Sequence, residues 1–408
     1  MTTVLFVGQP LWSAAGRAPA VCGFGAQPAP VAKTAAPPVL AYFYQWFTPS
    51  SWATRKLDSP LIGKYSSDDT AVMCDQVALA QGAGIDGFIV SWKVQGPNDA
   101  RLHALVRVAS ALHFKLAIIY QGLDRQRRPQ PADRVAHDLA EFRSNYGRDP
   151  VFRIFGAKPL VIWSGTPSYS VGDIAGVTTP LRRDMTILGY AQSVTEYERT
   201  ARYFDGNAYY WSSGNPRSTK GYAERLVGLG AAVHKDHGLW IAPFAPGFDA
   251  RKVCFPQPGD APDKCGSITV PRNDGATMRA GYASAVRSEP DALGLISWNE
   301  FSENTYIEPS KKLGLRYLGV LRDLRGITTG PSAAEYRLAA QAGVKVDDGF
   351  DSDSPDGRSW AGPVAIAVAV PAFLAFAVFL RRRGRRSERS VKTPSVSGDG
   401  GRHRDEPS

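Results

Sequence analysis

The sequence has few of the residues that build metal and redox sites. It contains only four cysteines and six histidines among 408 residues, with no C-x-x-C pair and no histidine-bearing ligand spacing. Structural zinc sites draw their ligands from such clusters, so we expect no metal site. No glycine-rich dinucleotide fingerprint follows the first apolar run either. We therefore expect no cofactor.

Charge of one sign is in excess, but the excess is partly local. The formal net charge is +10, and residues 381–408 hold nine Lys or Arg against four Asp or Glu, a surplus of five. This cluster adjoins an apolar segment, so a membrane surface explains it better than nucleic acid does. We predict no nucleic-acid partner.

Residues 360–380 are 21 consecutive residues without a charge. About 20 apolar residues suffice to cross a bilayer as a helix, so this segment is predicted to be transmembrane. A basic run follows it and an acidic stretch precedes it, which places the tail in the cytoplasm and the preceding chain outside. Residues 1–38 are interpreted as an export and linker segment, although they lack the basic start of an ordinary signal peptide.

The cysteines suit an oxidising compartment. Cys254 and Cys265 bracket a loop rich in proline and glycine, so we predict a disulfide between them. Cys74 lies on an apolar helical face and is predicted to be a buried thiol. Cys22 falls in the N-terminal segment, which is predicted to be processed or disordered.

Short apolar runs alternate with helical stretches from Val39 onward. Continuous apolar runs are typical of parallel strands that are covered on both sides. Eight alternating strand and helix units favour a (β/α)8 TIM barrel, an α/β fold, over an open sheet. The predicted strands are 39–47, 84–92, 115–121, 158–163, 186–192, 207–212, 239–246 and 292–300.

The regularity ends near Arg325. A polar stalk with a short helix over 333–342 is predicted before the membrane segment. The predicted domains are therefore the N-terminal segment 1–38, a catalytic barrel 39–325, a stalk 326–359, a transmembrane helix 360–380 and a disordered cytoplasmic tail 381–408.

Aromatic and amide side chains gather at the predicted strand ends, where barrels of this kind place their sites. Sugar rings stack their apolar faces on aromatic planes and hydrogen-bond to amides, so the set favours a glycan site. Any single aromatic residue could equally serve to close the barrel. The residues predicted to bind substrate are Tyr42, Tyr44, Trp92, Gln121, Tyr190, Trp211, Trp298, Asn299 and Tyr306.

Two glutamates follow directly from the eighth predicted strand. Glu300 and Glu303 are three residues apart, so in a turn or short helix they face the same side. Glycosidic cleavage needs one protonated carboxyl as acid and one ionised carboxylate as base or nucleophile. Two neighbouring carboxylates raise each other's proton affinity, which keeps one of them protonated. The alternative is a surface turn with two solvated glutamates.

The segment SWNEFSENTYIEP resembles the strand-eight motif of glycoside hydrolase family 99, the endo-α-mannosidases and endo-α-mannanases, which runs approximately WNEWHEGTQIEP. A second stretch, GKYSSDD at 63–69 followed by AGIDGFIVSW at 83–92, resembles the first helix and second strand of that family. Related barrel proteins of polysaccharide gene clusters share the likeness. The matching residues are Trp298, Asn299, Glu300, Glu303, Thr305, Ile307, Glu308 and Pro309.

The resemblance implies roles for the two glutamates. Glu300 would deprotonate the sugar 2-hydroxyl, so that O2 attacks C1 and forms a 1,2-anhydro sugar. Glu303 would be the acid and then the base that activates water, with net retention, while Trp92 and Tyr44 would line the sugar subsites. Glu308 is interpreted as a structural partner of a backbone or basic group.

The departures from the family pattern touch the pocket and put mannose specificity in question. Phe301, Ser302 and Asn304 replace the family's Trp, His and Gly, and Gln121 stands where the family has a glutamate. The leading hypothesis is an endo-acting retaining glycosidase on an extracellular or cell-envelope polysaccharide. The alternatives are a non-catalytic glycan-binding barrel and a transglycosylase.

Overall fold

The structure is a computed structural model that describes residues 21–22, 36–53, 56–94, 96–124, 126–252 and 268–346. The predicted membrane segment, the basic tail and the predicted Cys254–Cys265 disulfide all lie outside these residues. In the described part of the chain, no helix is long and apolar enough to span a bilayer.

Eight parallel strands form the barrel, and all eight predicted strands are confirmed. They are hydrogen-bonded in the order β5-β4-β3-β2-β1-β10-β7-β6. A parallel bridge between Gly189 and Asn207 joins the two outer strands and closes the ring. The strands are β1 (Val39–Phe43), β2 (Gly87–Trp92), β3 (Lys115–Tyr120), β4 (Leu160–Trp163), β5 (Thr186–Leu188), β6 (Gly206–Ala208), β7 (Leu239–Phe244) and β10 (Ala292–Leu295).

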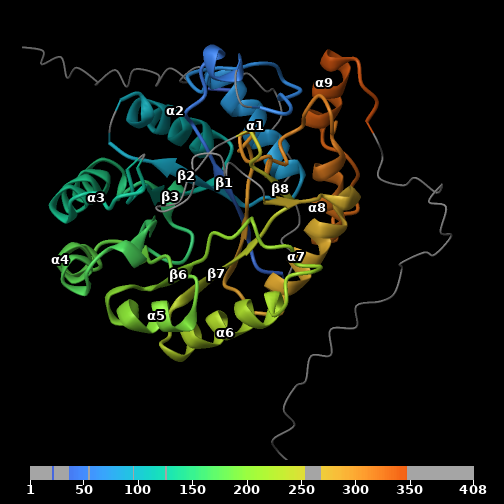
Figure 1. Ribbon diagram of the computed structural model, residues 1–408. Coiled ribbons are helices and arrows are strands. Elements are labelled where there is room, and N and C mark those ends of the chain that lie inside the picture. The colour runs from blue at the N-terminus through green and yellow to red at the C-terminus, as the bar shows by residue number, and fades with distance from the viewer. Residues whose placement is uncertain are drawn as a thin grey trace, which may run out of the picture. The chain divides into compact units, whose positions relative to one another are not determined.

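Helices surround the strands as an outer ring (Figure 1). Each predicted helix is present, and the largest differences are at the ends of the fourth, fifth, sixth and eighth. Asp69 caps the first helix as predicted, accepting hydrogen bonds from the amides of Ala71 and Val72. The helices are α1 (Thr70–Gly82), α2 (Asn98–Ala111), α3 (Ala132–Tyr146), α4 (Val171–Leu181), α5 (Val194–Thr200), α6 (Tyr222–Lys235), α7 (Ala276–Val286) and α8 (Arg316–Arg325).

The core has two layers, because successive side chains of a strand point to opposite faces. In β1, Leu40 and Tyr42 belong to a cluster that fills the barrel interior. Ala41 and Phe43 belong to a larger cluster that includes the inner faces of the helices. The same alternation continues past the strand ends and decides which loop residues face the site.

The folded domain extends beyond Arg325. Helix α9 (Ala333–Ala342) is present where the sequence predicted a short helix. It packs on α1, and its Glu335, fully buried, pairs with the buried guanidinium of Arg322. Residues 326–346 are therefore part of the folded domain, where the sequence had indicated the start of a stalk.

The prediction for Cys74 was wrong. Cys74 is buried, at 1% exposure, but it forms a disulfide with Cys22 across a sequence separation of 52 residues. The bond fastens residues 21–22 to α1, so this part of the N-terminal segment belongs to the fold. Among the described residues no cysteine is free. The apolar face correctly indicated burial, but it carried no information about the partner.

A small hairpin was not predicted. Strands β8 (Phe248–Asp249) and β9 (Thr269–Val270) pair antiparallel in the segment between β7 and α7. The amide of Asp249 donates to the carbonyl of Glu303 at 2.8 Å, so the hairpin supports the loop that follows β10. The two strands are too short for a hydrophobic pattern to indicate them.

Candidate active site

The loop after β10 brings Glu300 and Glu303 together at the carboxyl end of the barrel. Glu300 is 4% exposed, and its Oε1 accepts a hydrogen bond of 2.8 Å from the amide of Ser302. Its own amide donates to the hydroxyl of Ser297 at 2.9 Å. The two glutamates are close enough for the charge of Glu300 to raise the pKa of Glu303. The predicted pair is therefore one site and not two solvated side chains.

The two carboxyls differ in their affinity for a proton. Burial, and then the charge of Glu300, raises the pKa of Glu303 to about 8, against a smaller lowering by Arg127. Burial also raises the pKa of Glu300, but the Ser302 hydrogen bonds and the charge of Lys56 oppose it. Near neutrality, the proton therefore resides on Glu303, while Glu300 is the group equipped to be ionised.

Two tyrosines lie beside the carboxyls. The hydroxyls of Tyr44 and Tyr210 are 2.8 Å apart. Burial raises the pKa of both phenols, and the charges of Glu300 and Glu303 raise them further. Both phenols therefore stay protonated, and each can donate a hydrogen bond to oxygens of a bound ligand.

Tyr210 was missed in the sequence, where Trp211 was chosen instead. Trp211 stacks on Tyr209 at 5.4 Å and on Tyr222 of α6 at 4.4 Å, so it belongs to the outer layer. Ala208 belongs to the interior cluster, and a period of two from Ala208 selects Tyr210. The alternation was therefore a sufficient signal.

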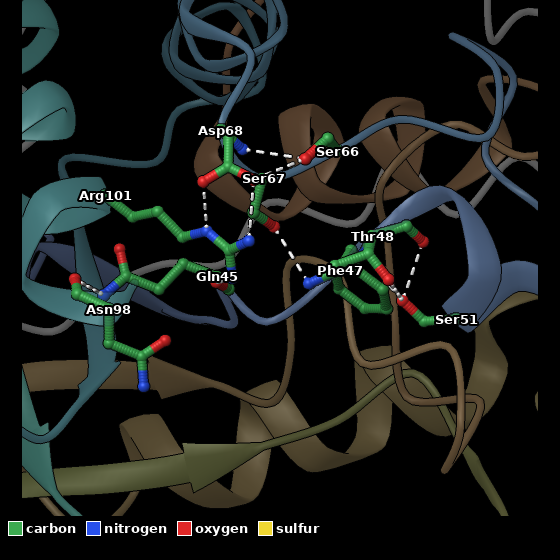
Figure 2. A network of polar contacts seen from close by, with 9 residues as sticks. All are labelled: Gln45, Phe47, Thr48, Ser51, Ser66, Ser67, Asp68, Asn98 and Arg101. Carbon is green, nitrogen blue, oxygen red and sulfur yellow. Dashed lines mark hydrogen bonds and ion pairs between the residues drawn. The ribbon is translucent and has the colours of Figure 1, made fainter. Parts of the chain in front are cut away.

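The segment after β1, which carries Tyr44, is held by a buried polar network (Figure 2). Arg101 of α2 donates two hydrogen bonds to Asp68, at 2.7 and 2.8 Å, and a third to the carbonyl of Gln45. The amide side chain of Gln45 donates in turn to the carbonyl of Asn98. Arg101 lowers the pKa of Asp68 to about 2, so this carboxylate is ionised whenever the chain is folded near neutrality.

Asn299 fixes Tyr44 from the other side. Its side chain accepts from the Tyr44 amide at 2.8 Å and donates to the Tyr44 carbonyl at 2.9 Å. Asn299 is 0% exposed, so the prediction that it binds substrate was wrong. Its side chain is used to hold the tyrosine next to the carboxyls.

Two further tryptophans predicted to bind sugar also face away from the site. Trp92 is 1% exposed and contacts Phe142 of α3 at 5.5 Å. Trp298 is 0% exposed and contacts Phe88 at 5.6 Å. Both occupy outward strand positions, where a large apolar side chain packs against the helices. These predictions were wrong for the same reason as that for Trp211.

Tyr42 and Tyr306 are also buried. Tyr42 is 1% exposed within the barrel and meets Tyr210 edge-on at 4.9 Å, so it supports the site from below. Tyr306 stacks on Phe301 at 4.0 Å, and its hydroxyl donates to Asp58. A direct contact with substrate is therefore not supported for either residue.

Three of the predicted substrate residues lie around the carboxyl pair with accessible surface. Tyr44 has been described above. Gln121 is half-buried at the end of β3 and donates to the hydroxyl of Ser91 at 3.1 Å. Tyr190, also half-buried, donates to the carbonyl of Tyr210 at 3.4 Å. Trp46, 45% exposed and 4.5 Å from the Tyr44 ring, adds an open aromatic face.

Glu308 is a second buried acid below the site. Its carboxyl accepts from the hydroxyl of Tyr65 at 2.9 Å and from the amide of Gln76 at 2.7 Å. Burial raises its pKa to about 8. A structural role was predicted, but with a backbone or basic partner, and the partners are instead neutral side chains. Tyr65 also accepts from Asn299, which links Glu308 to the support of Tyr44.

One group of side chains among the described residues has the spacing of metal ligands, and it lies elsewhere. His137, Asp138 and Glu141 lie on α3, in the outer ring. Asp138 already accepts a hydrogen bond of 2.9 Å from Tyr120. The carboxyl pair has no such arrangement around it, so the chemistry of the site is that of its own side chains.

A cavity of about 370 Å³ lies beside the carboxyl pair, between the β8–β9 hairpin and the loop after β10. Asn304, next to Glu303 in the chain, lines it and donates to the carbonyl of Asp249 at 2.7 Å. Arg272 and Lys312 are among the other lining residues. The volume lies at the lower end of the range for small-molecule sites.

Comparison with solved structures supports the resemblance at the level of fold. A family-99 endo-α-mannosidase from Bacteroides thetaiotaomicron is similar with a TM-score of 0.60 and 17% identity, over 71% of this chain and 98% of that chain. Its complex with bis-tris-propane gives 0.59 at 17% identity, with the same coverage of 71% and 98%. A glycoside hydrolase-like protein gives 0.56 at 15% identity, over 75% and 98%. No family model and no curated protein matches the sequence.

Proposed function

We propose that the chain is a glycoside hydrolase that cleaves an O-glycosidic bond with Glu303 as acid and Glu300 as base. The observation that carries this proposal is the difference in proton affinity between the two neighbouring carboxyls. Glu303 keeps its proton up to a pKa of about 8, and Glu300 is held toward its ionised form by Ser302 and Lys56. Glycosidic cleavage requires one carboxyl in each state.

The reaction follows from these two states. Glu303 gives its proton to the leaving oxygen while Glu300 takes the proton of the sugar 2-hydroxyl, and O2 closes on C1. Glu303, now ionised, then deprotonates water, which opens the anhydro ring at C1, and O2 recovers the proton from Glu300. The configuration at C1 is retained. An internal nucleophile gains the advantage of an intramolecular step.

The substrate proposed is a polysaccharide that is cleaved internally, with an α-mannan-like chain as the form suggested by the family resemblance. Tyr44, Trp46 and Tyr190 offer an aromatic rim around the pair, which suits the apolar faces of sugar rings. Capture of the intermediate by a sugar hydroxyl instead of water would make the protein a transglycosylase. A non-catalytic binding barrel is disfavoured, because binding alone gives no reason to bury two carboxyls together.

We further propose that the barrel lies outside the cell membrane, anchored by residues 360–380, and acts on a polymer of the cell envelope. The apolar segment and the basic run after it support this orientation. Protease added to intact cells should release a fragment that contains the barrel. Protection of the barrel from the protease would reverse the orientation.

The test of the activity is a screen of the full-length chain against α-mannans and envelope polysaccharides, with the anomers of the first products followed by NMR. We expect shortened chains whose new reducing ends first appear in the configuration of the cleaved bond. The Glu303→Gln variant is the control for contaminating activity. Cleavage with inverted configuration would exclude the anhydro intermediate, and a failure to cleave any glycan would leave the binding barrel as the better account.

A further inference from the structure

Two cations flank the carboxyl pair, one on each side. Lys56, in the segment after β1, is half-buried, and its ammonium donates to the hydroxyl of Ser302 at 3.3 Å. It also lies 5.8 Å from the ring centres of Phe47 and Trp52. Arg127 approaches from the segment after β3, and its charge acts on Glu303. Among the described residues, neither cation forms an ion pair with an acid, although both lie near Glu300 or Glu303.

The turn that carries Arg127 is built to present this side chain. Asp124 accepts hydrogen bonds from the amides of Gln126 and Arg128, at 2.9 and 2.8 Å, and the Arg128 guanidinium pairs with the same carboxylate. Arg127 itself has a left-handed backbone with φ of +61°, a conformation that costs a side-chain-bearing residue more than glycine. Its side chain is exposed and makes no printed-range hydrogen bond within the turn.

The base of this segment is fixed against the barrel. Gly122 lies so close to the end of β4 that an added Cβ would meet the carbonyl oxygen of Ser164 at 2.2 Å. The hydroxyl of Tyr169 also donates to the carbonyl of Gly122. The Arg127 turn is therefore attached at short range to the rim that holds Gln121, Tyr190 and the carboxyls.

A neutral glycan has no use for an exposed guanidinium in this place, whereas an acidic one needs it. A carboxylate, sulfate or phosphate on the sugar would be repelled by ionised Glu300, and a cation beside the pair offsets that repulsion. Guanidinium groups bind such oxyanions through two parallel hydrogen bonds. Gln121, at the end of the same strand, is neutral and adds no negative charge to this side of the site.

We propose that the site acts on an acidic glycan and that Arg127 binds the anionic substituent of a sugar next to the scissile bond. This inference rests on the proposed function, because it assigns a substrate class to the same site. The competing explanation is that Arg127 only adjusts the proton affinity of Glu303. In that case, replacing Arg127 would shift the pH dependence of turnover equally for charged and neutral substrates and would leave binding unchanged.

Binding to matched probes separates the two explanations. The full-length Glu303→Gln chain keeps a neutral side chain like the protonated acid and is not expected to turn the probes over. Its affinity is measured by calorimetry for a glucuronic-acid-containing polysaccharide and its carboxyl-reduced form. A phosphate-substituted mannan and its dephosphorylated form make the second pair, and the two pairs distinguish a carboxylate from a phosphate.

We expect the anionic member of at least one pair to bind roughly ten- to hundredfold more tightly than its neutral form, as for a hydrogen-bonded charge pair. Adding Arg127→Gln should abolish this preference. Adding Arg128→Gln, a change at the next residue whose guanidinium already pairs with Asp124, should preserve it. The melting temperature of each variant verifies folding. Equal affinity for charged and neutral forms, or a preference that survives Arg127→Gln, would overturn the inference.

The outcome also separates this inference from the proposed function. If the wild-type chain cleaves a glycan but shows no anionic preference, the function stands and the role of Arg127 is wrong. If it cleaves none, yet loses an anionic preference with Arg127→Gln, the site binds acidic glycans and the hydrolase assignment is wrong.

Discussion

At the scale of single residues, the neighbours of a carboxyl decide its role. Glu300 and Glu303 have the same side chain and leave the same strand end. Burial raises the pKa of both, but only Glu300 receives an amide hydrogen bond and a nearby lysine charge. Two carboxyls of one type are thereby divided into an acid and a base.

Glu308 provides a test of burial that is independent of catalysis. Its pKa is about 8 in the folded chain, against 4.5 as the ordinary value. Between these values the folded chain holds a proton that the unfolded chain releases, so stability falls as pH rises through this window. Each unit of difference in pKa corresponds to about 1.4 kcal/mol. The loss is complete only above the folded pKa.

Glu308→Gln removes this loss, because the amide is a neutral substitute for the protonated carboxyl. We expect the variant to gain stability relative to wild type as pH rises from 5 to 8.5 and to keep its turnover. Urea denaturation at several pH values measures the difference. Glu141→Gln, at an exposed residue of α3, is the matched control and should run parallel to wild type. A Glu308→Gln curve parallel to wild type would show that this carboxyl titrates normally.

At the scale of elements, strand alternation separates correct from incorrect site predictions. Glu300, Glu303 and Tyr44 were identified from the sequence because they follow strands at the carboxyl end of the barrel. Trp92, Trp211 and Trp298 also follow or end strands, but on the outward face. The continuous apolar runs of a parallel barrel hide which face is which, because both faces are buried. The register relative to the barrel axis supplied what the sequence left open.

Lys56 and Arg127 could not be predicted from the sequence. Each lies several residues beyond a strand, where the path of the loop decides the direction of the side chain. The Cys22–Cys74 disulfide has the same origin, since it joins a segment outside the barrel repeats to α1. The turn at Asp124 and the network at Arg101 are side-chain to backbone arrangements that leave no periodic signal.

Arg101 tests whether the segment after β1 must be held for activity. Arg101→Met removes three hydrogen bonds and leaves the carbonyl of Gln45 without its donor inside the fold. We expect a loss of about 1–3 kcal/mol in the free energy of unfolding. Turnover should fall roughly ten- to hundredfold, because displacement of Tyr44 disturbs the site.

Denaturation and kcat/KM measure these two effects. Arg143→Met, which breaks a half-exposed pair with Asp184, is the control and should cost less than about 1 kcal/mol without affecting turnover. If Arg101→Met behaves like this control, the network does not position Tyr44.

At the scale of the whole molecule, the fold could be predicted almost completely. Eight strands and their helices are read from hydrophobic runs, and the barrel follows from their strict alternation. The structural likeness to family-99 enzymes extends over about 71% of this chain. It places the carboxyl pair where barrels carry their catalytic groups, but the sugar depends on loops whose residues differ from the family motif.

The roles of the two glutamates are the central claim, and substrates with different leaving groups test them most directly. Turnover of Glu303→Gln and Glu300→Gln should be compared on the natural glycan and on an aryl glycoside with an activated leaving group. Glu303→Gln should lower turnover of the glycan by roughly 10²–10⁴-fold and that of the aryl glycoside far less, because an activated leaving group needs little protonation. Glu300→Gln should lower both, since the intermediate always requires its base. Near-native cleavage of the glycan by either folded variant would contradict the account.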